Sequence, residues 1–223
     1  MEAGFTELVR AIMKEIASRG EFVFCPELLG DIVDEVLNEE IVFSTCVTKL
    51  VLGKYDFSKK VGEVLYELYM EAREKRPVVG LLAASERGLI VALVERCCRC
   101  GRKVYVSIGS ALLIELYRRA GAEVRIFCPG CGAQELEKCQ KASESSQESE
   151  SSVSSPLLAV TLDVIILQKL VERGCIAAKP VLDELYNVLL HVAHMFLEAE
   201  IEHMRELHVY RSWVLGEARS ISA

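Results

Sequence analysis

Residues 97–131 read CCRCGRKVYVSIGSALLIELYRRAGAEVRIFCPGC, and the fold depends on where the two ends of this stretch lie. Each end carries a Cys-x-x-Cys pair. Between the pairs, hydrophobic periodicity predicts a strand over residues 103–108, a helix over 110–120 and a second strand over 123–127. The stretch therefore predicts a strand–helix–strand unit flanked by four thiols.

Strand-like and helical segments also alternate on the N-terminal side of this unit. Strands are predicted over residues 21–25, 41–47 and 78–84, and helices over residues 26–38, 58–76 and 86–98. Such alternation is typical of a mostly parallel sheet with helices on both faces. We therefore expect an α/β fold with a doubly wound, mostly parallel, Rossmann-like sheet and a helical C-terminal extension.

Composition divides the chain into three regions: an α/β domain (1–140), a Ser/Glu-rich flexible linker (141–156) and the helical extension (157–223). The linker is too polar to bury a core. Helices are predicted over residues 156–173 and from Pro180 to about Leu215, and both are apolar around most of their circumference. We expect them to pack on the first domain or to form a homodimer.

The chain has 223 residues and a net charge of −7, which disfavours nucleic-acid binding by the surface as a whole. Residues 96–125 are nevertheless locally basic, and they offer a patch for a small anionic ligand or nucleic acid. The most apolar stretch, 157–167, is too short to span a membrane, so no membrane partner and a cytoplasmic location are expected. Abundant Glu and Arg with few Asn and Gln indicate a thermophile.

The two cysteine pairs favour a structural zinc site. Each pair is followed by glycine, which allows backbone amides to turn toward the sulfurs, and four thiolates suit tetrahedral zinc. The predicted ligands are Cys97, Cys100, Cys128 and Cys131. The protein would then be a binding or regulatory protein rather than an enzyme.

The predicted fold conflicts with one shared metal. If strands 103–108 and 123–127 run antiparallel, both pairs lie at the same end. If they run parallel in one sheet, as a βαβ crossover requires, about 17 Å separates the pairs, whereas zinc–sulfur bonds are about 2.3 Å long. The fold argument favours the crossover.

A parallel sheet would favour a thiol enzyme instead. Cys128 would follow a strand and precede a helix, where its pKa is lowered, so Cys128 would be the nucleophile and Cys131 the resolving thiol of a redox or sulfur-transfer enzyme. Residues 78–135 resemble the sulfur-relay DsrE-like family, in which a strand ends in a cysteine, although the helices at both ends depart from that family.

The third hypothesis is that the cysteines are buried or disulfide-linked. Free cysteine is a small apolar core residue. This is the interpretation we favour for the remaining five, namely Cys25, Cys46, Cys98, Cys139 and Cys175.

Two strand-to-helix turns are candidate phosphate sites for a nucleotide or another phosphorylated ligand. Free amides at a helix N-terminus bind anions, and glycine allows close approach. The candidate residues are Ser85, Arg87, Gly88, Ser107, Gly109 and Ser110. Neither turn matches an established phosphate-binding motif, so an ordinary serine N-cap is the simpler interpretation.

All four histidines lie between His191 and His208. A metal site is one interpretation, because His191, His194 and Glu198 share a helix face. A solvated polar stripe on an apolar helix is the simpler one.

Overall fold

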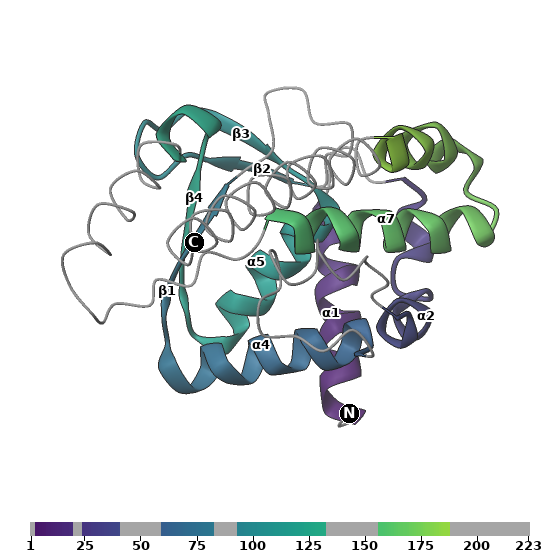
Figure 1. The fold of residues 1–223 in the computed structure, drawn as a ribbon, viewed down its shortest axis with the longest axis horizontal. Coiled ribbons are helices and arrows are strands. Elements are labelled where there is room, and N and C mark those ends of the chain that lie inside the picture. Colours follow the sequence, from purple (N-terminus) through teal and green to yellow (C-terminus); the bar gives the residue numbers. More distant parts are fainter. Residues whose placement is uncertain (1–2, 20–23, 41–58, 83–92, 133–155, 188–223) are drawn as a thin grey trace, which may run out of the picture.

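The computed structural model describes residues 3–19, 24–40, 59–82, 93–132 and 156–187. Helices predominate among them, and the strands form two separate two-stranded sheets (Figure 1). The expected doubly wound, mostly parallel, Rossmann-like sheet is therefore wrong, because the described residues contain only one parallel strand pair. The remaining pair is an antiparallel hairpin.

The four strands pair differently from the predicted order. Strand β1 (Val78–Leu82) pairs in parallel with β4 (Glu123–Phe127), so Val78 lies opposite Glu123. Strand β2 (Leu93–Arg96) pairs antiparallel with β3 (Lys103–Val106). Residues 93–96 were predicted to belong to a helix. The apolar run that contains them has neither clear helical nor clear strand periodicity, and pairing with β3 decides its conformation.

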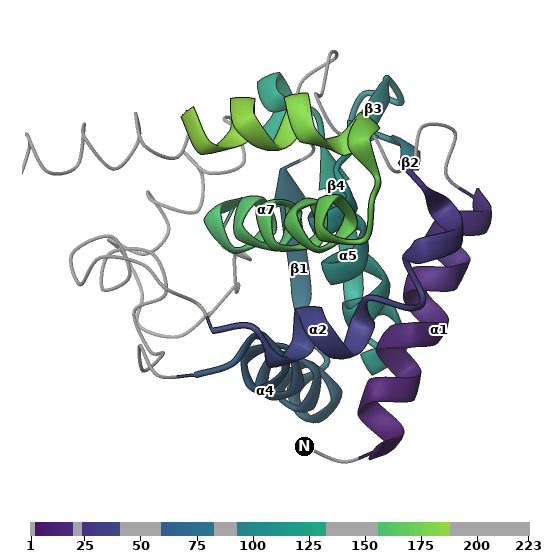
Figure 2. The same ribbon diagram turned by 90° about the vertical axis from the view of Figure 1, so that its right-hand side faces the viewer.

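Helix α5 (Ile108–Ala120) is the centre of the molecule. All of its residues are buried except Arg118 and Arg119. It contacts α1 (Ala3–Arg19), α4 (Val61–Lys75) and α7 (Pro156–Glu172), and it also touches β1 and β4 (Figure 2). A helix that is apolar around most of its circumference requires such enclosure.

Several predicted elements are confirmed. Helix α4 ends before Pro77, β4 has the predicted bounds, and α7 ends just before Gly174, which has a φ of 94°. The predicted helix over residues 26–38 is instead split into η1 (Pro26–Leu28) and α2 (Val33–Asn38). Gly30, a weak helix former, lies between them, close to Lys14 of α1.

The C-terminal part of the described chain shares the core of the first part. Leu162, Ile166 and Leu170 of α7 are fully buried in the same cluster as residues of α1, α2, α4 and α5. After η2 (Ile176–Ala178), residues 179–187 are helical, near the predicted start at Pro180. Residues 41–47, the linker residues 143–155 and the remainder of the last helix lie outside the described residues, so the domain division and the homodimer stay predictions.

Helices α5 and α7 meet closely at Gly109. A Cβ atom at this position would lie 2.2 Å from the backbone oxygen of Ala159 and 2.9 Å from the backbone nitrogen of Asp163. Because both neighbours are backbone atoms, neither can move without shifting α7. Only glycine allows this approach.

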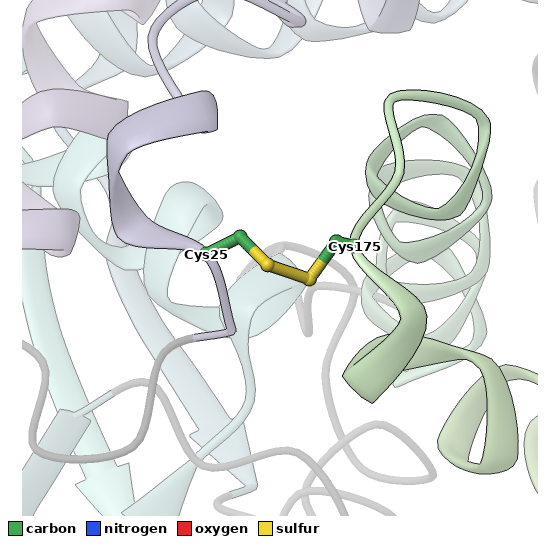
Figure 3. Close-up of a disulfide and its surroundings, with 2 residues drawn as sticks. All are labelled: Cys25 and Cys175. Carbon is green, nitrogen blue, oxygen red and sulfur yellow. A yellow bond between two sulfur atoms is a disulfide. The ribbon is translucent and has the colours of Figure 1, made fainter.

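A disulfide joins Cys25, next to η1, to Cys175, next to η2 (Figure 3). The two cysteines are separated by 150 residues in the sequence. Cys175 is buried and Cys25 half-buried. The bond therefore ties the N-terminal part of the chain to the segment that follows α7.

No helix within the described part of the chain combines the length and the apolar character needed to cross a membrane.

We predict that Gly109→Ala lowers the free energy of unfolding by about 3 kcal/mol or more, because the new methyl group would collide with the backbone of α7. Urea denaturation measures the change. Gly4→Ala is the matched control, since a Cβ at this exposed position of α1 meets nothing within 4 Å. The control should be neutral or stabilising by up to about 1 kcal/mol. Equal stability of the two variants would contradict the close approach.

We also predict that removing the disulfide with Cys25→Ser and Cys175→Ser lowers the free energy of unfolding by about 3 to 5 kcal/mol, because the bond closes a long loop in the unfolded chain. Denaturation with and without a reductant measures this effect. Reductant should destabilise the unsubstituted protein and leave the double variant unchanged. A reductant effect of the same size on both proteins would show that the bond contributes nothing.

Candidate metal centre

The first cysteine pair lies in the turn of the β2–β3 hairpin. The backbone N–H of Cys97 donates to the carbonyl oxygen of Arg102 at 2.8 Å, and the N–H of Gly101 donates to the carbonyl of Cys97 at 2.9 Å. Gly101 has a φ of 70°, a left-handed conformation that glycine adopts readily. These bonds fold the chain back so that Cys97 and Cys100 lie on the same turn.

The second pair follows β4. Cys128 is the first residue after the strand, and residues 129–132 form a helical turn in which the Gly132 N–H donates to the Cys128 carbonyl at 2.8 Å. Proline at position 129 suits the first position of a helix. The turn brings Cys131 back toward Cys128.

One backbone hydrogen bond joins the two sheets at this place. The N–H of Cys98 donates to the carbonyl of Ile126 in β4 at 2.9 Å. The hairpin turn therefore lies beside the carboxyl end of β4. Figure 1 shows β3, α5 and β4 as three sides of a loop that closes at this corner.

The crossover that separated the two cysteine pairs is therefore wrong. It assumed that β3 and β4 run side by side in one sheet, whereas β3 pairs with β2 and β4 pairs with β1. Strand β3 starts at the cysteine corner and β4 ends there. Both pairs consequently meet at the same place.

The four sulfur atoms are close enough to hold one metal ion. The Sγ atoms of Cys97, Cys100, Cys128 and Cys131 all lie within 4.8 Å of one another, and those of Cys100 and Cys128 are 3.8 Å apart. A tetrahedron with zinc–sulfur bonds of about 2.3 Å has sulfur–sulfur edges of about 3.8 Å. Cys97 and Cys128 are buried, Cys131 is half-buried and Cys100 is exposed.

Cys97 and Cys131 have strongly perturbed acidities. Burial alone would raise the pKa of Cys97, but hydrogen bonds from the backbone of Cys128, Cys100 and Arg99 lower this pKa to about 6. A hydrogen bond with the side chain of Cys128 and then burial raise the pKa of Cys131 to about 12. The thiols thus compete for negative charge. A cation among them removes this competition, because metal binding displaces thiol protons.

The arrangement does not favour the thiol-enzyme hypothesis. Cys128, its expected nucleophile, has 6% of its surface exposed, and the pKa of Cys131, the expected resolving thiol, is raised. A reactive cysteine needs both access and a lowered pKa. Cys97 has the lowered pKa, but only 2% of its surface is exposed.

Of the other cysteines, Cys25 and Cys175 confirm the prediction of buried or disulfide-linked thiols, whereas Cys98 departs from it. Cys25 and Cys175 form the disulfide, and Cys98 is exposed. Cys46 and Cys139 lie outside the described residues, as do His191, His208 and the histidines between them.

The N-terminus of α5 holds one of the candidate phosphate turns, and a side chain of the protein already occupies it. Ser107 is the N-cap and accepts from the Ser110 N–H at 3.2 Å, and the Gly109 N–H donates to Oδ1 of Asp163 at 2.6 Å. The serine N-cap interpretation is thus confirmed. Ser85, Arg87 and Gly88, the other candidate turn, lie outside the described residues.

Asp163 is the polar site residue that sequence analysis missed. Burial raises its pKa to about 7, although hydrogen bonds from the Gly109 backbone and the Ser107 side chain act in the opposite direction. The available signal was a single acidic residue within the apolar stretch 157–167. Nothing in that stretch identifies its partner, which lies 54 residues earlier in the chain.

Comparison of the chain with protein-family models, with curated proteins and with solved structures finds no match in any of the three.

We predict that Asp163 makes the protein less stable as the pH rises. Its folded pKa of about 7 lies above its ordinary value of 3.8, so the folded state binds the proton more tightly. The free energy of unfolding should therefore fall between about pH 4 and pH 7, by about 4 kcal/mol, and stay constant above. Asp163→Asn keeps an oxygen acceptor for Gly109 and removes the charge, so it should remove this fall.

Urea denaturation of both proteins at pH 5 and pH 8 tests the assignment. The difference between the free energies of unfolding of the two proteins, taken at the same pH, cancels the pH effects that they share, including acid release of a metal. The variant should match the unsubstituted protein at low pH and exceed it in stability at pH 8. A variant that is less stable at pH 8 would show that the N-terminus of α5 stabilises the carboxylate more than burial penalises it.

Proposed function

We propose that this chain is a binding or regulatory protein in which Cys97, Cys100, Cys128 and Cys131 hold one structural zinc ion. The observation that carries this proposal is the convergence of four sulfur atoms within 4.8 Å of one another. They come from two segments separated by a strand, a helix and another strand. Zinc would fasten the β2–β3 hairpin to the end of β4.

The donor set favours zinc. Four thiolates in tetrahedral arrangement bind zinc or iron and are a poor site for magnesium or calcium, which prefer oxygen ligands. Zinc needs no redox partner, and closed four-cysteine sites are typical of its structural role. Backbone groups of Cys128, Cys100 and Arg99 hydrogen-bond to the Cys97 sulfur and favour its thiolate form.

The same donor set argues against a catalytic metal. Catalytic zinc sites leave one position for water or substrate, whereas here the protein supplies all four ligands. The two segments that carry the ligands, residues 96–103 and 126–132, contain no histidine or acidic residue that would serve as a general base beside the metal. A role in holding a binding surface fits this arrangement better than a role in chemistry.

A structural zinc also suits the small size of the sheets. An isolated two-stranded hairpin is marginally stable in water. The β2–β3 hairpin is only four residues long on each side, and one backbone hydrogen bond from its turn reaches β4. A metal ion bound by both segments would supply the missing cross-link.

We predict that the purified chain contains one zinc ion per molecule, measured by elemental analysis together with protein concentration. Cys100→Ser or Cys131→Ser should reduce zinc content to near zero and lower thermal stability, since binding of structural zinc contributes directly to folding. Cys98→Ser is the matched control, because Cys98 lies within the same turn but outside the group of four sulfurs. The control should keep its zinc.

Two other outcomes would overturn the assignment. Stoichiometric iron in place of zinc would keep the site and change its metal. Counting reactive thiols before and after denaturation separates the remaining case. We expect the metal to protect four thiols in the folded protein, and we expect these four thiols to react once the protein is denatured. Two additional disulfides among these cysteines, with no metal, would show that the sulfurs cross-link the corner directly.

A further inference from the structure

The β2–β3 hairpin has one face toward the body of the protein and one face away from it. Side chains alternate along a strand, and residues directly opposite each other share a face. Leu93, Val104 and Val106 are buried, and Glu95 on the same face forms an ion pair with Arg118 of α5 at 3.2 Å. The opposite face therefore consists of Val94, Arg96, Lys103 and Tyr105.

The outward face contains an unfavourable charge pair. Arg96 and Lys103 lie directly opposite each other, and both are exposed. Like charges at such positions repel. Arg96 donates to the backbone oxygen of Gly101 at 3.2 Å, and neither cation has a carboxylate partner among the residues that the structure describes. An anion bound between them would remove the repulsion.

The positive charge is concentrated at the proposed metal centre. The two segments that surround the centre, residues 96–103 and 126–132, contain four basic residues and no acidic one, although the whole chain has a net charge of −7. Arg99 and Arg102 in the turn are exposed. Glu95 and Glu123 lie just beyond these segments, and each forms an ion pair, with Arg118 and Arg125 respectively. Part of the basic charge balances the thiolates, and the pair on the outward face projects away from them.

We propose that this face of the hairpin binds single-stranded nucleic acid. Arg96 and Lys103 contact successive phosphates, and the half-buried ring of Tyr105 stacks on a base. The inference rests on the proposed function, because the metal holds the turn that carries these residues.

The combination of groups favours nucleic acid over an acidic peptide. Guanidinium groups match phosphate oxygens in shape, and Arg96 supplies one on this face. Tyr105 lies diagonally across from Arg96 on the same face, and aromatic rings beside cations are the usual platform for unpaired bases. A peptide carboxylate would use the charges and leave the ring without a role.

Fluorescence anisotropy with the full zinc-loaded chain and a labelled oligothymidylate of roughly 20 nucleotides tests the proposal. We expect saturable binding at about 50 mM salt, with a slope of log affinity against log salt of about −1.4, from the two phosphate contacts of Arg96 and Lys103. Arg96→Ala with Lys103→Ala should weaken binding about tenfold or more and flatten the slope. Lys103→Ala alone, which leaves the Arg96–Gly101 hydrogen bond in place, should give part of the loss.

Tyr105 provides a second, independent readout. Tyr105→Leu should weaken binding about tenfold, whereas Tyr105→Phe should retain it because the stacking ring remains. Arg73→Ala with Lys179→Ala is the matched control, since it removes two exposed cations away from the hairpin. It should leave the affinity unchanged. The zinc content of every variant is measured on the same sample.

Three results would overturn the inference: no binding at low salt, equal losses in the hairpin and control variants, or equally tight binding of polyaspartate or a duplex of the same length. Zinc without oligonucleotide binding would refute this inference and leave the zinc site intact. Binding that depends on Arg96, Lys103 and Tyr105 in a protein without zinc would refute the zinc site and support this inference.

Discussion

The hydrogen bond from the Gly109 backbone to the buried carboxylate of Asp163 fixes α7 against α5, and the rest of the structure is arranged around that contact. A side chain at position 109 would prevent it. Because α5 is enclosed on nearly every side, its burial requires α1, α4, α7 and the β1–β4 pair together. A helix N-terminus presents free N–H groups, and here a carboxylate of the same chain satisfies one of them. The turn that would suit a phosphate thus serves internal packing.

The placement of α5 in turn determines where the cysteines lie. Strand β3 leads directly into α5, and only Gly121 and Ala122 separate α5 from β4. The orientation of this helix therefore fixes the end of β3 and the start of β4. The Cys98–Ile126 hydrogen bond then closes the loop at the corner. The four thiols consequently depend on the packing of a helix that contributes none of them.

The sequence predicted where individual helices and strands lie better than it predicted which elements or residues they contact. Helix α4 before Pro77, strand β4 and helix α7 follow from periodicity and from the positions of proline and glycine. The four proposed ligands follow from their spacing. Strand β2 was missed because a continuous apolar run suits either a helix or a strand until its neighbour is known. The same limit applies to Asp163 with Gly109 and to Cys25 with Cys175, because the partners are far apart in the chain.

A metal at the corner would also make the outward face of the hairpin a better binding surface. Ordering a flexible loop at the moment of binding weakens affinity, whereas a loop that is already fixed avoids that loss. The repulsion between Arg96 and Lys103 opposes hairpin formation, so the hairpin needs stabilisation from elsewhere in the absence of an anion. Zinc binding would supply it, since the free energy of metal binding is available for folding. The four thiols and the two cations would then be parts of one arrangement, in which the metal would hold together a surface whose own charges favour separation until an anion binds.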